Sequence, residues 1–289
     1  MFSTQSKLLS VSLLALLLLS SCSETNASSV VTGGDSAQAS VQAGGKMGGV
    51  HDLVLTEEGL LMGTHNGVWI QVGTETPARV GDSRFDAMAL SGYSGGLIAS
   101  GHPDSSEEQV GSLGLRKSSD GGATWASVSL YGVADFHRLR ASGASIIGLA
   151  SGSLVRSDDS GVTWLELPNP NIFDFAMNPT SSNEIVASTE AGLISSSDGG
   201  QSFSTISDAP FLALLSWGSN RLAGVSPTGA VYNSMDNGKT WQEAGNVPGG
   251  PRAFSSLGDE MTILAEGAIY YSKDAGENFT ERIAGVPGH

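Results

Sequence analysis

Cysteine is almost absent from this chain of 289 residues, because Cys22 is the only one. A single cysteine cannot form a disulfide or a cysteine-based metal site within one chain. Basic residues are also scarce: 14 lysines and arginines stand against 29 aspartates and glutamates, and the formal net charge is −15. Such a surface repels nucleic-acid phosphates and anionic lipid headgroups. We therefore expect no nucleic-acid partner, and any membrane attachment must be covalent or hydrophobic.

The hydrophobic run in the N-terminal leader is too short to span a bilayer comfortably. Lys7 precedes the twelve-residue apolar stretch Leu8 to Leu19, which is typical of a signal peptide. The stretch ends in Leu19-Ser20-Ser21-Cys22. This ending resembles the bacterial lipobox, whose cysteine is lipidated and becomes the first residue of the mature protein. We expect residues 1–21 to be a lipoprotein signal peptide and Cys22 to anchor the chain at a membrane of the bacterial cell envelope, on a membrane surface or in the periplasm. The alternative is an ordinary signal peptide with a chance cysteine.

Large apolar side chains are rare in the segment after Cys22. Residues 23–47 are mainly Ser, Thr, Ala, Gly and Gln, and such a composition cannot bury enough apolar surface to fold. We expect residues 22–47 to be the lipidated cysteine and a disordered, flexible tether. The folded domain is expected over residues 48–289.

A sequence repeat fills most of that domain. The pattern Ser-x-Asp-x-Gly-x-(Thr/Ser/Asn)-(Trp/Phe) occurs five times, with its aspartates 38 or 39 residues apart. These aspartates are Asp120, Asp159, Asp198, Asp236 and Asp274. A fixed period of this size indicates a repeat architecture. Asp followed by Gly favours a hairpin turn, and the flanking residues favour strands. We expect the aspartates to hold turns and to take no part in catalysis.

The repeat resembles the Asp-box, or BNR repeat, of sialidase-like β-propellers, in which the box joins the third and fourth strands of a four-stranded blade. The resemblance implies an all-β, six-bladed β-propeller with four-stranded antiparallel blades. Blade one has lost its box, and blade two contains an insertion from Gly101 to Ser112. The expected inner strands are His51–Thr56, Asp86–Ser91, Asp135–Ala141, Phe173–Met177, Phe211–Trp217 and Ala253–Leu257. A seven-bladed ring is the alternative, and a strand at Ser28–Thr32 could close the ring.

Sialidase chemistry does not fit this chain. The sialidase resemblance implies three arginines, a Tyr nucleophile with its Glu, an Asp acid/base and an Arg-Ile-Pro-type motif, and that motif is absent. Tyr270 and Tyr271 fall on a predicted third strand. A glycoside hydrolase that uses two carboxylates remains the alternative function. Its candidate residues are Asp86, Asp135 and Asp174, near the starts of predicted inner strands.

Four of the five histidines lie in the first half of the chain, at related positions of the repeat. His51 and His137 come near the starts of the inner strands of blades one and three, and Met88 takes that position in blade two. His65 and His102 end or follow second strands. Strand starts and second-strand ends face one rim of a propeller, so these five side chains are candidate ligands of a metal in the central funnel. Imidazole and thioether ligands favour copper, and imidazole alone also suits zinc. The alternative is that they are separate core or loop residues.

Three further segments resemble a family of bacterial envelope propellers that are often labelled glycosyl hydrolase-like. These segments are Ala99–Pro103, Leu113–Leu115 and Ala134–Leu139. That family usually opens with His-x-His-Gly-Leu, whereas this chain has Gly49-Val50-His51-Asp52-Leu53. Assembly factors of photosystems share the plan of a lipoprotein with a propeller. We expect a monomeric, envelope-anchored, non-catalytic binding or assembly module with an envelope protein or a glycan as partner, and with copper or zinc as its cofactor.

Overall fold

The structure is a computed structural model that describes residues 41–42, 45–104 and 111–287. All of the regular secondary structure in these residues is β-strand. None of the described residues lies in a helix long and apolar enough to cross a membrane. The predicted signal peptide, Cys22, the tether up to residue 40 and the suggested strand at Ser28–Thr32 lie outside the described residues, as does part of the predicted insertion.

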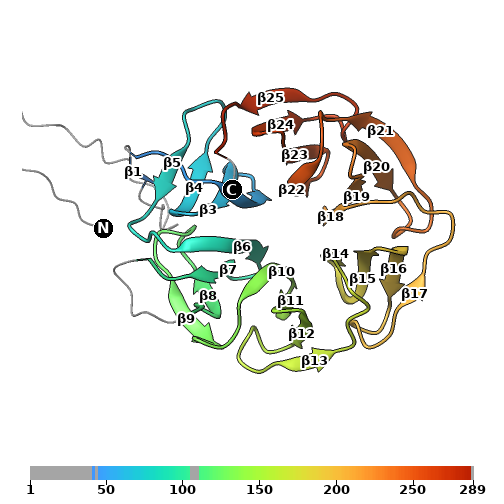
Figure 1. The fold of residues 1–289 in the computed structure, drawn as a ribbon, viewed down its shortest axis with the longest axis horizontal. Coiled ribbons are helices and arrows are strands. Elements are labelled where there is room, and N and C mark those ends of the chain that lie inside the picture. The colour runs from blue at the N-terminus through green and yellow to red at the C-terminus, as the bar shows by residue number, and fades with distance from the viewer. Residues whose placement is uncertain (1–40, 43–44, 105–110, 288–289) are drawn as a thin grey trace, which may run out of the picture. The chain divides into compact units, whose positions relative to one another are not determined.

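The described strands form six antiparallel sheets around a common axis, and each sheet is one blade (Figure 1). In every blade the first strand is the innermost, and the next three follow outward in chain order. The prediction of a six-bladed β-propeller is confirmed, and the seven-bladed alternative is wrong for the residues that the structure describes. Predicted and observed strands mostly differ by three residues or fewer at their ends.

The first three blades contain the residues of the site described below. Blade one consists of β2 (Val50–Leu55), β3 (Leu60–Thr64), β4 (Gly67–Gln71) and β5 (Ala78–Val80). Blade two consists of β6 (Asp86–Tyr93), β7 (Gly96–His102), β8 (Leu115–Ser118) and β9 (Ala126–Ser129). Blade three consists of β10 (Phe136–Ser142), β11 (Ser145–Ala150), β12 (Ser153–Ser157) and β13 (Leu165–Leu167).

The other three blades complete the ring. Blade four consists of β14 (Asp174–Asn178), β15 (Ser181–Thr189), β16 (Gly192–Ser196) and β17 (Ser204–Thr205). Blade five consists of β18 (Leu214–Trp217), β19 (Leu222–Val225), β20 (Ala230–Ser234) and β21 (Gln242–Asn246). Blade six consists of β22 (Pro251–Leu257), β23 (Glu260–Ala265), β24 (Ala268–Ser272) and β25 (Thr280–Ile283).

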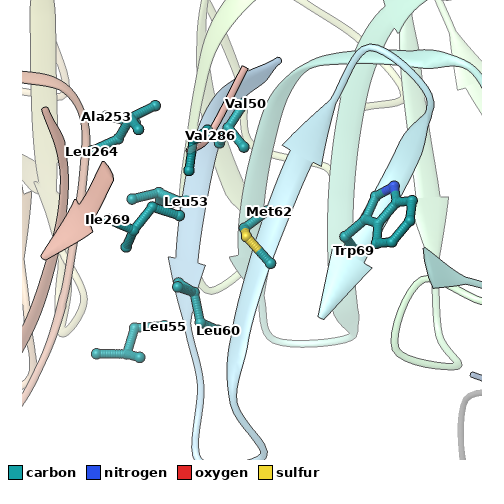
Figure 2. Packing of buried hydrophobic residues seen from close by; sticks show 10 residues of the cluster. All are labelled: Val50, Leu53, Leu55, Leu60, Met62, Trp69, Ala253, Leu264, Ile269 and Val286. Carbon is teal, nitrogen blue, oxygen red and sulfur yellow. The ribbon is translucent and has the colours of Figure 1, made fainter. Parts of the chain in front are cut away.

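The ring closes between blade six and blade one by side-chain packing. One buried cluster joins residues of both blades to Val286, which follows the last strand (Figure 2). Arg282 adds hydrogen bonds to the Gln71 side chain and to the Gly73 carbonyl, at 2.6 and 2.8 Å. A short strand, β1 (Val41–Gln42), pairs with β5 at the outer edge of blade one. Blade six is built from the consecutive strands β22 to β25, and in the described residues it shares no strand with blade one. The ring is therefore closed by side-chain contacts and not by a shared sheet.

The five repeated turns have the same hydrogen bonds. In the first of them, Asp120 accepts bonds from the backbone N–H and the hydroxyl of Thr124, at 2.9 and 2.6 Å, and from the Ser118 hydroxyl at 2.7 Å. The Ser118 hydroxyl in turn accepts the Gly122 N–H at 2.8 Å. Equivalent bonds lower the pKa of Asp198, Asp236 and Asp274 to about 2, with the side-chain bond from the residue four positions later as the largest cause. The carboxylates thus replace backbone partners that the tight turn leaves out.

A buried layer of polar groups joins the inner strands across the axis. These strands belong to different sheets, so the N–H groups that face a neighbouring blade need other acceptors. Asp52 accepts the Leu90 N–H at 3.1 Å, and Asp174 accepts the Leu215 N–H at 2.8 Å. Arg140 lies between these two carboxylates, 3.5 Å from each. Burial alone lowers the pKa of Arg140, but the two carboxylates outweigh it and raise the pKa.

Candidate metal centre

Four inner strands carry a β-bulge within their first residues. The strand pairing skips one residue in each, so this residue has no partner on the second strand. The skipped residues are His51 in β2, Met88 in β6, His137 in β10 and Arg252 in β22. A bulge redirects a side chain, and bulges are frequent beside functional sites. All four residues line one cavity of about 270 Å³ at this end of the funnel, together with Val50 and Arg138.

The second strands end beside these bulges. The register pairs Val50 of β2 with Thr64 of β3, and Asp86 of β6 with His102 of β7. His65 follows directly after β3, and His102 is the last residue of β7. The expectation that strand starts and second-strand ends share one rim therefore agrees with the observed pairing. Two neighbouring blades bring three histidines and one aspartate to the same rim.

His51, His65 and Asp86 form a compact group. Each offers one ligand atom, and these atoms all lie within 4.8 Å of one another. The imidazole rings of His51 and His65 lie 4.4 Å apart between centroids, at an angle of 37°. His51 Nε2 lies 2.9 Å from Asp86 Oδ1. The His51 side chain is 6% exposed and that of Asp86 28% exposed, whereas His65 is exposed. The group is thus buried on the side of His51 and accessible to solvent on the side of His65.

The Asp86 carboxyl is ionised at neutral pH. Burial raises its pKa, but the contact with His51 and the charges of His51, His65 and His102 outweigh burial, so the pKa lies below its usual value. An ionised carboxylate beside two imidazoles is a common ligand set for zinc, at distances of about 2.0–2.2 Å. Copper also accepts imidazole ligands. These three residues can therefore hold a transition-metal ion with a coordination position left open.

The other two predicted histidines form a second group around Asp135. His102 Nε2 lies 3.4 Å from Asp135 Oδ2, and His137 Nδ1 lies 3.8 Å from the same oxygen. His102 also faces blade two, since its Nδ1 lies 3.7 Å from Asp86 Oδ2. Four histidines and two aspartates thus form a continuous row along the rim, from blade one to blade three.

The predicted methionine lies at the same rim as the histidines. Met88 lines the cavity with His51 and His137. Met47 and Met62, which lie near these histidines in sequence, pack in or against the buried cluster of Figure 2. The compact group of His51, His65 and Asp86 supplies two nitrogen ligands and one oxygen ligand.

Asp86 and Asp135 were predicted as candidate catalytic carboxylates and not as metal ligands. A signal for their role lies in the sequence, because Asp86 precedes Met88 by two residues, as Asp135 precedes His137. Asp174, the third candidate carboxylate, is in a different environment. It is 1% exposed and lies 3.3 Å from Arg138 and 3.5 Å from Arg140. Asp174 therefore belongs to the buried polar layer and is closed to substrates.

Comparison with known proteins shows the fold and not the activity. Neither the protein-family models nor the curated protein sequences gave a match. Among solved structures, the chain is similar to the gluconolactonase XC5397 from Xanthomonas campestris, with a TM-score of 0.60, 11% identity and coverage of 78% of this chain and 86% of that one. It is similar to YCF48 bound to D1 peptide, with a TM-score of 0.51, 16% identity and coverage of 86% and 85%.

Larger enzymes are also similar to this chain over part of their length. The GH74 xyloglucanase from Xanthomonas campestris has a TM-score of 0.54 and 17% identity, and the match covers 81% of this chain but 38% of the enzyme. The chain thus spans well under half of that enzyme. At such low identity these similarities support a β-propeller, a fold that hosts both enzymes and binding proteins.

Proposed function

We propose that this chain is a non-catalytic binding module of the bacterial cell envelope, and that it holds one zinc or copper ion at His51, His65 and Asp86. The observation that carries the proposal is the convergence of three ligand atoms, within 4.8 Å of one another, from two neighbouring blades. Two imidazoles and a carboxylate suit zinc, and imidazoles suit copper. Lipidation at Cys22 would anchor the module to the membrane as a monomer, and the open side of the ion would face an envelope protein or a glycan.

The similar structures support a binding module without deciding for it. YCF48, which has about the same length as this chain, is known bound to D1 peptide. The xyloglucanase and the gluconolactonase have the same fold and are enzymes. Function therefore has to be argued from the site, and the histidine–aspartate group is the part of this rim whose chemistry points to a specific ligand.

Metal content tests the proposal directly. The purified protein would be exposed to zinc(II), copper(II) or copper(I), desalted and analysed for metal per chain. The His65→Ala variant should lose the ion, because His65 is an exposed ligand whose removal leaves the fold intact. His289→Ala, which removes the fifth histidine of the chain, is the matched control and should retain the ion. Absence of retained metal in the unmodified protein would reject the proposed function.

A glycoside hydrolase is the second candidate. Asp86 and Asp135 face His102 from its two ring nitrogens, at 3.7 and 3.4 Å, so two carboxylates lie at the same rim. Glycosidases use such a pair as acid and base or as acid and nucleophile. A screen with aryl glycosides would test this function, and hydrolysis that disappears in both Asp86→Asn and Asp135→Asn would favour it over the binding module.

A further inference from the structure

We propose that the cavity at this end of the funnel binds an oxyanion, the carboxylate or phosphate group of a small ligand, between His137, Arg138 and Arg252. This inference goes beyond the proposed metal-binding function, because it assigns a ligand that needs no metal ion. The three residues come from two blades: His137 and Arg138 lie in β10, and Arg252 lies in β22. All three line the cavity of about 270 Å³ described above.

The lining of this cavity is basic, although the chain as a whole is acidic. The formal net charge is −15, yet two arginines and two histidines line the cavity, and no carboxylate of the described residues does. Two outer grooves are lined in part by glutamates: Glu243 and Glu277 in one groove, and Glu57, Glu58, Glu260 and Glu281 in the other. An anion therefore meets positive charge in the funnel cavity and negative charge in those grooves.

Arg252 supplies a guanidinium that no carboxylate neutralises directly. It is the bulge residue of β22, and it is exposed. Arg252 forms no ion pair with the described residues, in contrast to Arg138, Arg140, Arg156 and Arg221. A guanidinium has five N–H donors in a planar fork, and it binds a carboxylate or a phosphate through two parallel hydrogen bonds. Arg252 therefore brings available donors to the wall of the cavity.

Arg138 is held from the buried side and is open to solvent on the other. Its Nε lies 3.3 Å from Asp174 Oδ1, and its Nη1 donates a hydrogen bond to the His137 carbonyl at 2.8 Å. The Arg138 side chain is 25% exposed, whereas that of Asp174 is 2% exposed. Two guanidiniums that line one cavity repel each other, and a bound anion offsets this repulsion. Arg138 and Arg252 thus favour an anion in the space that they share.

His137 and two apolar side chains complete the site. The His137 side chain is 49% exposed, and an imidazole N–H can donate to an oxyanion. Val50 and Met88 line the same cavity. Because a water molecule takes about 30 Å³ in the liquid, a carboxylate or phosphate group of a few heavy atoms fills only part of 270 Å³. The remaining space beside Val50 and Met88 suits a short apolar portion of the ligand.

Calorimetric titration of metal-free protein tests the inference. The purified full-length protein would be treated with a chelator, desalted, and titrated with inorganic phosphate, acetate or butyrate at constant ionic strength. Metal is removed because His51 lines the cavity and is also a ligand of the proposed ion. We expect one anion per chain, and the comparison of phosphate with acetate shows which oxyanion is preferred. Butyrate should bind several-fold tighter than acetate, because it buries two more CH₂ groups. Equal affinity for both would overturn the apolar part of the site.

Matched variants test the role of Arg252. Arg252→Gln should weaken anion binding at least tenfold, whereas Arg252→Lys keeps the charge without the fork and should give an intermediate affinity. Lys273→Gln removes one positive charge from the exposed turn of the same blade, so it is the control and should bind like the unmodified protein. Thermal melting would check that each variant is folded. Unchanged affinity in Arg252→Gln, or an equal loss in Lys273→Gln, would overturn the site.

Metal analysis of the same protein separates this inference from the proposed function. Anion binding in a protein that retains no added zinc supports the oxyanion site and rejects the proposed metal site. Retained zinc without anion binding overturns the oxyanion site and leaves the proposed function standing. A protein that binds neither overturns both.

Discussion

Two pairs of aspartates at the starts of inner strands have opposite environments. The side chains of Asp52 and Asp174 are 4% and 2% exposed, and both contact Arg140 and a backbone N–H of the next blade. Asp86 and Asp135 are 28% exposed, and they face imidazoles at the rim. Aspartate side chains thus join neighbouring blades in the buried layer and face imidazoles at the exposed rim.

Position along the strand accounts for the difference. Asp52 directly follows His51, the bulge residue of its strand, and both Asp52 and Asp174 accept a backbone N–H of the next blade. Asp86 lies two residues before the bulge residue of its strand, and Asp135 two residues before His137. A shift of three residues therefore moves a carboxylate from the closed layer to the open rim. The predictions below test this contrast.

The largest effect is expected from Asp174→Ala. The change leaves Arg140 with one carboxylate in a buried layer, and removal of one partner of a buried ion pair typically costs about 3–5 kcal/mol. Chemical denaturation should show this loss in the free energy of unfolding. A loss below about 1 kcal/mol would mean that solvent reaches Arg140 and that the buried polar layer does not join the inner strands as described above.

Metal should stabilise the protein through the rim carboxylates. An ion that binds the folded state adds about 2.7 kcal/mol to the free energy of unfolding when its free concentration is 100 times Kd. Zinc at that excess should therefore raise the melting temperature of the unmodified protein, and a chelator should reverse the rise. In His65→Ala the contribution of the ion at His51, His65 and Asp86 to the free energy of unfolding should be missing. An equal rise in His65→Ala and in the unmodified protein would contradict the assignment of that residue as a ligand.

A smaller effect is expected from Asp135→Asn in metal-free protein. Its contacts with His102 and His137 are long and partly exposed, and exposed ion pairs contribute about 0–1 kcal/mol. Denaturation midpoints should therefore almost coincide with those of the unmodified protein. A loss as large as that expected for Asp174→Ala would remove the distinction between the two pairs.

The turn aspartates Asp198, Asp236 and Asp274 give a third, partly exposed environment with a characteristic pH dependence. The pKa of Asp198, Asp236 and Asp274 is lowered to about 2 in the folded protein. A lowered pKa contributes stability above the unfolded value near 3.8, and this contribution is lost as the pH falls through about 2. The double variant Asp198→Asn/Asp236→Asn should therefore show a weaker decrease in melting temperature over that acid range than the unmodified protein. Identical acid profiles would contradict this role of the turn carboxylates.

Much of the fold could be predicted from the sequence because the repeat has a regular period. Third strands such as β12 (Ser153–Ser157) and β20 (Ala230–Ser234) end at the first serine of the repeated pattern, so the pattern marks where these strands end. Inner strands were harder to predict. The inner strand of blade five was expected from Phe211, but β18 begins at Leu214. No turn motif marks that boundary, and Phe211 is exposed.

The candidate site was predicted only in part. The repeat alignment pointed to the equivalence of His51, Met88 and His137, because equivalent positions share one rim. It could not reveal the bulges, since the register of two strands depends on pairing rather than on residue type. The partners of Asp86 and of Arg140 come from other blades, so these contacts depend on how the blades pack together.

The closure of the ring has a consequence for how such a protein can be rearranged. Each blade is one uninterrupted segment, and Val286 packs in the same cluster as Val50, so the two ends of the domain meet (Figure 2). A linker that joins these ends, with new termini opened in a loop between two other blades, would leave every sheet whole. The domain is therefore modular in the sense of a circular permutation, and a duplicated or deleted repeat would add or remove a complete blade.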